Sequence, residues 1–515
     1  MSKQLFDMAV KAALLGAAMG CSGSSSSDFK NGGGGVNGGA GGTNNGPLGA
    51  GFGSGTGGGG AGSGATGAVG PGGSMGVPQN CPGGGSTTIS GTVYDPAMQN
   101  PLYNITVYVP KSAALPALTP GASCNTCTSL FPEILASAVT DANGHFTIPN
   151  APWGPNLPLV VQTGKWRKEY TLANVTQCKD NPQPDKSLRL PKNAIHGDGD
   201  LPDIAISTGG ADSLECLLMR IGVDTDEYAV GPAGPGHLHI FTGHAGASTM
   251  PASPDSSQTL WNATASLMKY DVLLLSCEGV ETTNLDNQGR QSLVDYSAAG
   301  GRVFASHYHY YWFNVGPFAN ANLAQWTPGA QVLDDGPPPP TFAGNVITTL
   351  ANGMTFPEGV ALKQWLGTVN ALTNGQLPIW FSRHNADVGP MNWPPSQPWI
   401  ELDQTTPAPK ATQYFSFDTP IGKTPACGRV VYSDLHVSGG PDTNGPGVPP
   451  DYPAMPSMRM RRGGGQAMAG IVPSGCATHP LTPQEKALEF MIFDLSSCLI
   501  PIGQVAMPPK GAPPR

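Results

Sequence analysis

Three consecutive stretches decide the fold of this 515-residue chain: MKYDVLLLSCEG (268–279), NQGRQSLVDYSAAGG (287–301) and RVFASHYHYYW (302–312). The first and third are short, continuously apolar runs, which is typical of strands buried on both faces of a parallel sheet. The middle stretch is typical of a helix that stops at its Gly-Gly pair. The alternation predicts an α/β domain with a doubly wound parallel sheet.

The same alternation begins upstream. LPDIAIST (201–208) and HLHIFTG (237–243) are expected strands, and SLECLLMRIG (213–222) is an amphipathic helix with a glycine stop. We therefore assign residues 200–500 to the α/β domain, with a Pro-rich and tryptophan-bearing insertion around 337–410.

The order of YDVLLLSCEG (270–279), LVDYSAAGG (293–301) and RVFASHYH (302–309) resembles the class I glutamine amidotransferase-like fold, including its relatives near the trehalose-utilisation proteins. CGRVVYSDLHVSGG (427–440) resembles the closing strand of that fold, where a histidine is carried, and residues 481–498 resemble its terminal helix.

This resemblance implies a nucleophile where Ser306 stands and a later histidine at His436. In amidotransferases the nucleophile is a cysteine at a tight elbow, assisted by a histidine and a carboxylate. Here a serine replaces the cysteine, and Ser438 stands where the motif has glutamate, so glutamine amidotransferase activity is not expected. The catalytic candidates that remain, for a Ser/His hydrolase, are Ser306, His307 and His436.

Two His-x-His pairs are candidates for a zinc site. On a strand, residues two apart project to one face, and strand ends of a doubly wound sheet point at a common crevice. The candidate metal ligands are His307, His309, His237, His239 and Asp434, and Glu278 and His436 are further candidates for the same zinc site. The alternative is that one histidine of each pair is buried and hydrogen-bonded while the other meets solvent, in a pocket kept after its chemistry was lost.

Residues 87–178 have the pattern of a small β-sandwich. TTISGTVYDP (87–96) and NITVYVP (104–110) alternate apolar and polar residues, and a turn signal, Asp-Ala-Asn-Gly, lies inside AVTDANGHFTIPNAP (138–152). This order resembles the carboxypeptidase regulatory-like domain, a transthyretin-like or Cna-B-like sandwich. The resemblance implies a spacer or adhesive unit, with sugar binding inferred from the fold class.

Aromatic and acidic side chains in both domains are candidates for ligand binding. Aromatic rings could stack on a sugar, although packing in the core is the simpler role for such residues in a small sandwich. The candidates are Trp153, Trp166, Tyr170, Glu278 and Trp312.

The first 21 residues predict export. Lys3 and Lys11 precede an apolar run too short to span a bilayer, which ends in AAMGC (17–21). This resembles a bacterial lipoprotein signal, which implies cleavage before Cys21, acylation of that cysteine and, because Ser22 follows it, an outer-membrane location. The alternative is an ordinary secretory signal.

A tether and a tail flank the expected domains. Residues 22–86 are nearly all small or polar, with no charged residue between Lys30 and Asp95, which predicts a disordered, flexible linker. A Pro-rich tail occupies 501–515.

Nine cysteines besides Cys21 fit an exported, disulfide-containing chain. Cys81 and Cys178 flank the sandwich and are expected to staple its ends. For the CNTC stretch (124–127) a structural or loop disulfide is favoured over a redox pair or half a zinc site. Cys277 could be a reactive thiol, but pairing with Cys216 is favoured. The disulfide candidates are Cys81, Cys178, Cys124, Cys127, Cys216, Cys277, Cys476 and Cys498.

Charge excludes one class of partner. The net charge is −9 and no long Lys/Arg cluster occurs, which argues against nucleic acid binding. We predict a surface lipoprotein, held to the membrane by its lipid, that binds carbohydrate or envelope proteins through a non-catalytic amidotransferase-like domain. The competing hypothesis is an exported metal- or Ser/His-dependent hydrolase of a sugar or peptide derivative, with zinc as the one cofactor considered. A Ser/His enzyme should place Ser306 within hydrogen-bond reach of a histidine.

Overall fold

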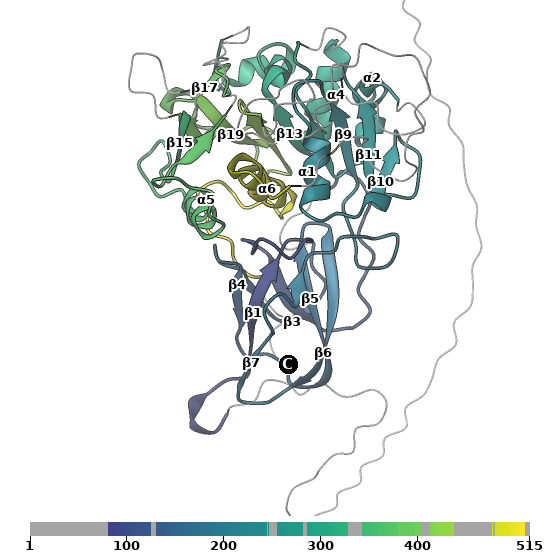
Figure 1. Cartoon of the computed structure of the whole chain (residues 1–515), viewed down its shortest axis with the longest axis vertical. Helices are drawn as coiled ribbons and strands as arrows, with labels where there is room; N and C mark the ends of the chain where they lie inside the picture. The colour runs from purple at the N-terminus through teal and green to yellow at the C-terminus, as the bar shows by residue number, and fades with distance from the viewer. Residues whose placement is uncertain are drawn as a thin grey trace, which may run out of the picture. The chain divides into compact units, whose positions relative to one another are not determined.

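The computed structural model describes residues 81–124, 130–244, 246, 255–281, 286–327, 342–380, 382–402, 411–436, 476 and 479–509. The signal segment with Cys21, the tether up to residue 80, Cys127 and the tail beyond residue 509 lie outside the described residues. The described part consists of a β-sandwich and an α/β domain, as the sequence predicts (Figure 1).

The sandwich has two sheets, and both contain antiparallel pairs. Alternating apolar residues cover the inner faces, as in the strand from Ile134 to Val139, where every second side chain is buried. One sheet has the order β4-β1-β7, with β8 beside the end of β1; the other has the order β3-β2-β5-β6. The strands are β1 (Thr88–Tyr94), β2 (Thr106–Pro110), β3 (Ile134–Val139), β4 (His145–Ile148), β5 (Gly154–Thr163), β6 (Trp166–Val175), β7 (Asp180–Pro182) and β8 (Leu188–Arg189).

The α/β domain is built on a ten-stranded sheet of order β10-β11-β9-β12-β13-β20-β19-β18-β15-β16. Its first six strands are mutually parallel, and they are β10 (Tyr228–Val230), β11 (Leu238–Thr242), β9 (Ile204–Thr208), β12 (Val272–Leu275), β13 (Arg302–Ser306) and β20 (Gly428–Ser433). The expected insertion contributes most of an antiparallel extension, formed by β19 (Thr412–Thr419), β18 (Gln397–Leu402), β15 (Phe342–Val346) and β16 (Leu377–Ile379). The sheet is therefore mixed rather than wholly parallel.

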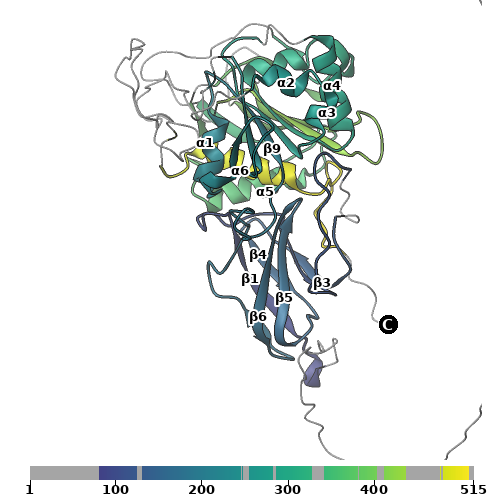
Figure 2. The same ribbon diagram turned by 90° about the vertical axis from the view of Figure 1, so that its right-hand side faces the viewer.

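Helices cover both faces of this sheet, which makes it doubly wound (Figure 2). On one face lie α1 (Leu214–Arg220), α5 (Pro357–Thr368) and α6 (Pro483–Ser496); on the other lie α2 (Ser257–Trp261), α3 (Thr264–Leu267) and α4 (Asn287–Ala298). Successive residues of each central strand enter opposite cores, because side chains alternate along a strand. Leu274 and Phe304 face the α6 core, whereas Leu273 and Val303 face the α4 core.

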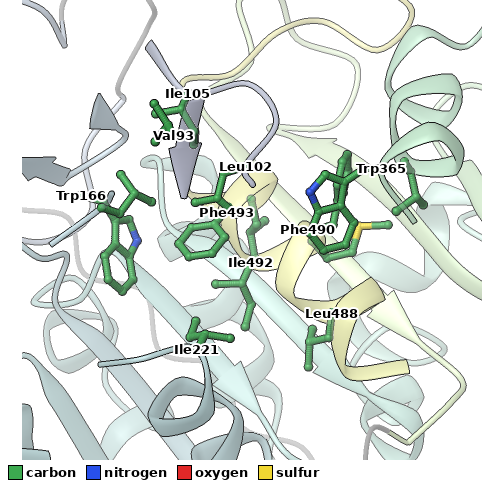
Figure 3. Close-up of a cluster of buried hydrophobic side chains, with 14 of the residues drawn as sticks. Val93, Leu102, Ile105, Trp166, Ile221, Trp365, Leu488, Phe490, Ile492 and Phe493 are labelled. Carbon is green, nitrogen blue, oxygen red and sulfur yellow. The ribbon is translucent and has the colours of Figure 1, made fainter. Parts of the chain in front are cut away.

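The sandwich and the α/β domain share one continuous apolar core around α6 (Figure 3). The Trp166 ring meets Phe493 edge-on with centroids 5.6 Å apart, and Tyr103 stacks on Phe490 at 5.5 Å. Trp365, from α5, donates from Nε1 to the carbonyl oxygen of Pro101 at 2.5 Å. The terminal helix therefore stabilises both parts of the described chain.

Disulfides link distant segments. The expected Cys81–Cys178 bridge is present, and Cys124 pairs with Cys427 and Cys216 with Cys476. Cys498 is also disulfide-bonded. The CNTC stretch therefore carries a structural disulfide, with Cys124 joined to Cys427 rather than within the loop. The favoured Cys216–Cys277 pairing is wrong, because packing brings Cys476 to Cys216.

These bridges indicate an oxidising, extracytoplasmic environment. Within the described ranges, every helix is too short or too polar to cross a bilayer.

Candidate functional site

Three adjacent parallel strands bring Cys277, His307 and His436 together at their carboxyl ends. β12 and β13 pair Leu275 with Ala305, and β13 and β20 pair Ser306 with Ser433, so the residues that follow meet at one edge. Cys277 Sγ lies 3.3 Å from His307 Nδ1, and His436 Nε2 lies 3.3 Å from the same nitrogen. All three residues are buried. We call them the Cys-His-His cluster.

His307 enters the cluster from a turn, not from a strand. β13 ends at Ser306, and His307 has a left-handed φ of 39° and begins a 3₁₀ turn, His307–Trp312. This conformation is uncommon for residues other than glycine and tends to occur at functional sites. The hydroxyl of Tyr432 lies 2.8 Å from the His307 carbonyl oxygen and supports the turn.

The expectation that His307 and His309 project to one face of a strand is therefore wrong. His309 places Nε2 2.9 Å from the Ser276 carbonyl oxygen, and it is not part of the cluster. The 3₁₀ turn that starts at His307 removes the period of two on which the expectation rested.

Burial disfavours the charged forms of the three cluster residues. It lowers the pKa of both His307 and His436 well below the usual range, with the nearby Arg383 guanidinium as a second cause. Burial also raises the pKa of the Cys277 thiol to about 12. A catalytic cysteine, by contrast, has a lowered pKa.

Asp434 is not part of the cluster but fixes the backbone and the tyrosine next to it. Its Oδ2 accepts hydrogen bonds from the Asn385 and Ala386 N–H groups, the latter at 3.0 Å, and Tyr432 OH lies 3.0 Å from Oδ1. Burial raises the pKa of Asp434 to about 7 despite these bonds. The role of metal ligand expected for Asp434 is not seen, because its oxygens are turned to backbone and to Tyr432.

Ser306 does not form the expected pair with a histidine. Its hydroxyl donates to Asp212 Oδ2 at 3.0 Å, and both residues are buried. The side chain of Ser306, still in the extended strand, is directed to Asp212, whereas His307 lies in the following turn.

The other His-x-His pair lies outside the cluster. His237 Nδ1 lies 2.8 Å from Glu227 Oε2, and His239 Nδ1 lies 2.8 Å from the Gly231 carbonyl oxygen. Of the two His-x-His pairs, only His307 belongs to the cluster. Cys277 and His436 complete it, and their shared position just after neighbouring parallel strands was the sequence signal for this.

A polar cleft lies at the carboxyl ends of β11 and β12, and we call it the strand-end cleft. Its volume is about 190 Å³. Glu278, which follows Cys277 in the chain, accepts a hydrogen bond from the His244 N–H at 3.1 Å. A Cβ at Gly243 would lie 2.2 Å from the Thr208 carbonyl oxygen and 2.5 Å from Glu278 Oε1, so the close backbone contact requires glycine here. The lining residues are Thr242, Gly243, His244, Ser256, Ser257, Gln258, Trp261, Glu278, Val280 and Glu281.

The aromatic residues expected to stack on a ligand do not form an exposed platform. Trp166 and Trp312 are fully buried, Trp166 against Phe493 and Trp312 against Trp261. Trp153 and Tyr170 are half-buried and pack against the core. Large aromatic side chains fill the interior of this protein, which is why the expectation fails. Glu278 is the expected ligand residue that lines the cleft.

Comparisons with known proteins give no family. No family model matches the sequence, and no curated protein matches it significantly. Among solved structures, the cytoplasmic protein STM3548 from Salmonella typhimurium is 12% identical, with a TM-score of 0.25, over 46% of this chain and 89% of its own. A protein described as ThuA-like, from Bacteroides uniformis, is 11% identical, with a TM-score of 0.24, over 45% and 80%.

A third similarity involves a type II cohesin-X-dockerin complex from Acetivibrio cellulolyticus, at 19% identity and a TM-score of 0.15, over 24% of this chain and 76% of the other. Likenesses at this level carry no weight for what the chain binds, which rests on its own residues.

Proposed function

We propose that this chain is an exported binding protein whose α/β domain holds a small, polyhydroxylated ligand of the sugar class in the strand-end cleft. The observation that carries the proposal is a polar cleft at the topological switch point of the sheet. β11 and β12 flank β9 on opposite sides, and their carboxyl ends supply Thr242, Gly243 and Glu278. Ligands of open α/β sheets bind in this crevice.

The size of the cleft favours a small ligand. Pockets for drug-sized molecules span roughly 300–1,000 Å³, whereas this cleft measures about 190 Å³. One sugar ring is on that scale. A protein ligand, the other class suggested by the sequence, needs a larger contact surface than a cleft of this size supplies.

The lining chemistry favours hydroxyl groups. The carboxylates of Glu278 and Glu281 accept hydrogen bonds, the Gln258 amide donates and accepts, and serine hydroxyls do both. Ser257 Oγ is held 2.7 Å from Ser207 Oγ, which fixes its position. Two carboxylates disfavour an anionic ligand through like-charge repulsion.

The proposal retains the domain interpretation and the anchor predicted from the sequence. The sandwich is then a carboxypeptidase regulatory-like spacer, the α/β domain a non-catalytic relative of amidotransferases, and acylated Cys21 holds the chain at the outer membrane. The disulfides support an extracytoplasmic location.

The test is calorimetric titration of the purified chain with neutral monosaccharides and with the matching uronic acids. We expect a neutral sugar to bind and its uronic acid to bind at least tenfold more weakly. Glu278→Gln and Gln258→Ala should each weaken binding by tenfold or more, whereas the exposed Glu133→Gln should not. Equal binding by Glu278→Gln and the parent chain, or no binding of any neutral sugar, would refute the cleft as the site.

The anchor has a separate test in cell fractionation. The parent chain should sediment with membranes and carry an acylated Cys21 by mass spectrometry, and Cys21→Ser should abolish both. A parent chain found in the soluble fraction would refute the lipid anchor and leave the cleft proposal intact.

A further inference from the structure

We propose that Cys277 Sγ, His307 Nδ1 and His436 Nε2 bind a zinc ion. This site goes beyond the proposed function, since sugar binding in the strand-end cleft does not require a metal. Nitrogen and thiolate sulfur are the ligand atoms zinc prefers, whereas magnesium and calcium prefer oxygen.

The distances between the three atoms fit a shared tetrahedral ion. Zinc lies about 2.3 Å from sulfur and about 2.0–2.1 Å from imidazole nitrogen, so tetrahedral angles place two nitrogens about 3.3 Å apart and sulfur about 3.6 Å from nitrogen. The observed separations are 3.3 Å between the two histidine nitrogens and 3.3 Å between Cys277 Sγ and His307 Nδ1. All three atoms lie within 4.8 Å of one another.

Hydrogen bonds alone do not explain the convergence. His307 Nδ1 carries either one proton or one lone pair, so it can serve Cys277 Sγ or His436 Nε2 but not both. A purely hydrogen-bonded cluster would leave a buried polar atom facing another without a bond, which is costly. A cation accepts a lone pair from all three atoms at once.

The redox state of Cys277 is a second, independent observation. The chain forms disulfides that link distant segments, and seven other described cysteines are disulfide-bonded. Cys277 is the free cysteine of the described residues, and it is buried. A thiol kept reduced in an oxidising compartment is explained if a metal binds it.

The surroundings hold the ligands in place. The Gly279 N–H donates to Cys277 Sγ at 3.5 Å, which suits a metal-bound thiolate. Tyr432 bridges the His307 carbonyl oxygen and Asp434, and so ties two ligand-bearing strand ends together. Such outer contacts orient metal ligands in known sites.

A three-residue set leaves a fourth position for water or for a ligand group. This is the pattern of catalytic zinc sites, in which the metal lowers the pKa of its bound water. Glu278, the residue after Cys277, lines the strand-end cleft, so one zinc ligand is adjacent in the chain to the proposed sugar site.

The test is metal analysis of the full chain, exported by cells grown with zinc and purified without chelator. We expect about one zinc per chain. Cys277→Ser, His307→Gln and His436→Gln should each lower the zinc content at least tenfold. The matched control is His237→Gln, a histidine outside the cluster that should keep its zinc. Zinc retained by all three cluster variants, or a folded parent chain without zinc, would overturn the site.

Cobalt substitution removes dependence on how the variants fold. The parent chain, stripped of metal and reloaded with Co²⁺, should show a sulfur-to-cobalt charge-transfer band together with the visible bands of tetrahedral cobalt. Loss of the charge-transfer band with the visible bands kept would exclude Cys277 as a ligand and overturn the proposal. Stoichiometric copper in the purified chain would overturn the assignment to zinc. Calorimetric titration of the zinc-free chain with neutral sugars tests the strand-end cleft independently of the zinc site.

Discussion

Lys165 and Asp271 form a buried ion pair that joins the β-sandwich to the central sheet. Lys165 lies in the turn between β5 and β6, and Asp271 directly precedes β12. Lys165 Nζ also donates to the Gly121 carbonyl oxygen at 2.7 Å, and Asp271 Oδ2 accepts from the Asp203 N–H at 2.9 Å. Each charge therefore has further hydrogen bonds, which a buried ion pair needs to be stable.

Lys165→Met should destabilise the protein strongly, because it leaves the Asp271 carboxylate buried without its cation. We expect the free energy of unfolding to fall by about 3–5 kcal/mol, measured by urea denaturation. Lys111→Met is the control: Lys111 and Glu133 are exposed and 2.6 Å apart, and such surface pairs contribute about 0–1 kcal/mol. Equal effects of the two substitutions would contradict the structural importance of the buried pair.

Gly164→Ala and Gly367→Ala should change stability in opposite directions. Gly164 has a φ of +53°, and a Cβ there would lie 1.9 Å from the Ser496 carbonyl oxygen at the end of α6. We expect Gly164→Ala to lower the free energy of unfolding by about 2 kcal/mol or more. Gly367, in α5, has no atom within 4 Å of such a Cβ, so alanine should raise stability by about 0.5–1 kcal/mol. Thermal melts of both variants measure the direction of each change in stability. An unchanged melting temperature for Gly164→Ala would contradict the close packing of Gly164 on α6.

Glu489→Gln should make stability less sensitive to rising pH. Burial raises the pKa of Asp95 to about 6 and that of its neighbour Glu489 well above the usual range. Unfolded carboxyl groups ionise near pH 4. The folded chain keeps these protons at higher pH, so the stability linked to them is full below about pH 4 and declines as pH rises.

The measurement is the urea midpoint at pH 5 and pH 8. The midpoint of the parent chain should fall more between these values than that of Glu489→Gln, which has no proton to lose and can keep a hydrogen bond to Asn100, 2.7 Å from Glu489 Oε2 in the parent. The control Glu133→Gln should follow the parent curve. Parallel curves for all three proteins would mean that the buried carboxyl pair does not hold a proton.

The Cys124–Cys427 bridge should stabilise the protein measurably. It joins residues 303 positions apart, from the loop after β2 to the turn before β20. We expect the double substitution Cys124→Ser/Cys427→Ser to lower the free energy of unfolding by about 2–5 kcal/mol, seen as a lower melting temperature under oxidising conditions. Under reducing conditions the difference in melting temperature between the parent and the double variant should disappear. A difference that persists under reducing conditions would show that the serines change packing and that the bridge is not the cause.

Much of the fold could be predicted because apolar periodicity is a local property. The runs around Leu273 and Val303 predicted strands buried on both faces, and each of these strands does alternate between two cores. The antiparallel half of the sheet was missed. Three of its four strands lie in the expected insertion, and the fourth, β19, follows it. A Pro-rich run and scattered tryptophans hide the apolar pattern in the insertion, where Trp365 and Trp399 are core residues.

The sequence by itself determined the two domain types, the alternation of strands and helices in the parallel part of the sheet, and the pairing of Cys81 with Cys178. Only the tertiary structure decided the site. Cys277, His307 and His436 are separated by 30 and 129 positions, and they meet because β12, β13 and β20 are neighbours in the sheet. The backbone of His307 has a left-handed conformation, which the spacing of residues in the sequence does not predict. Side-chain periodicity records which face of a strand is buried, but the place where each strand ends and which strands become neighbours depend on packing between segments far apart in the chain.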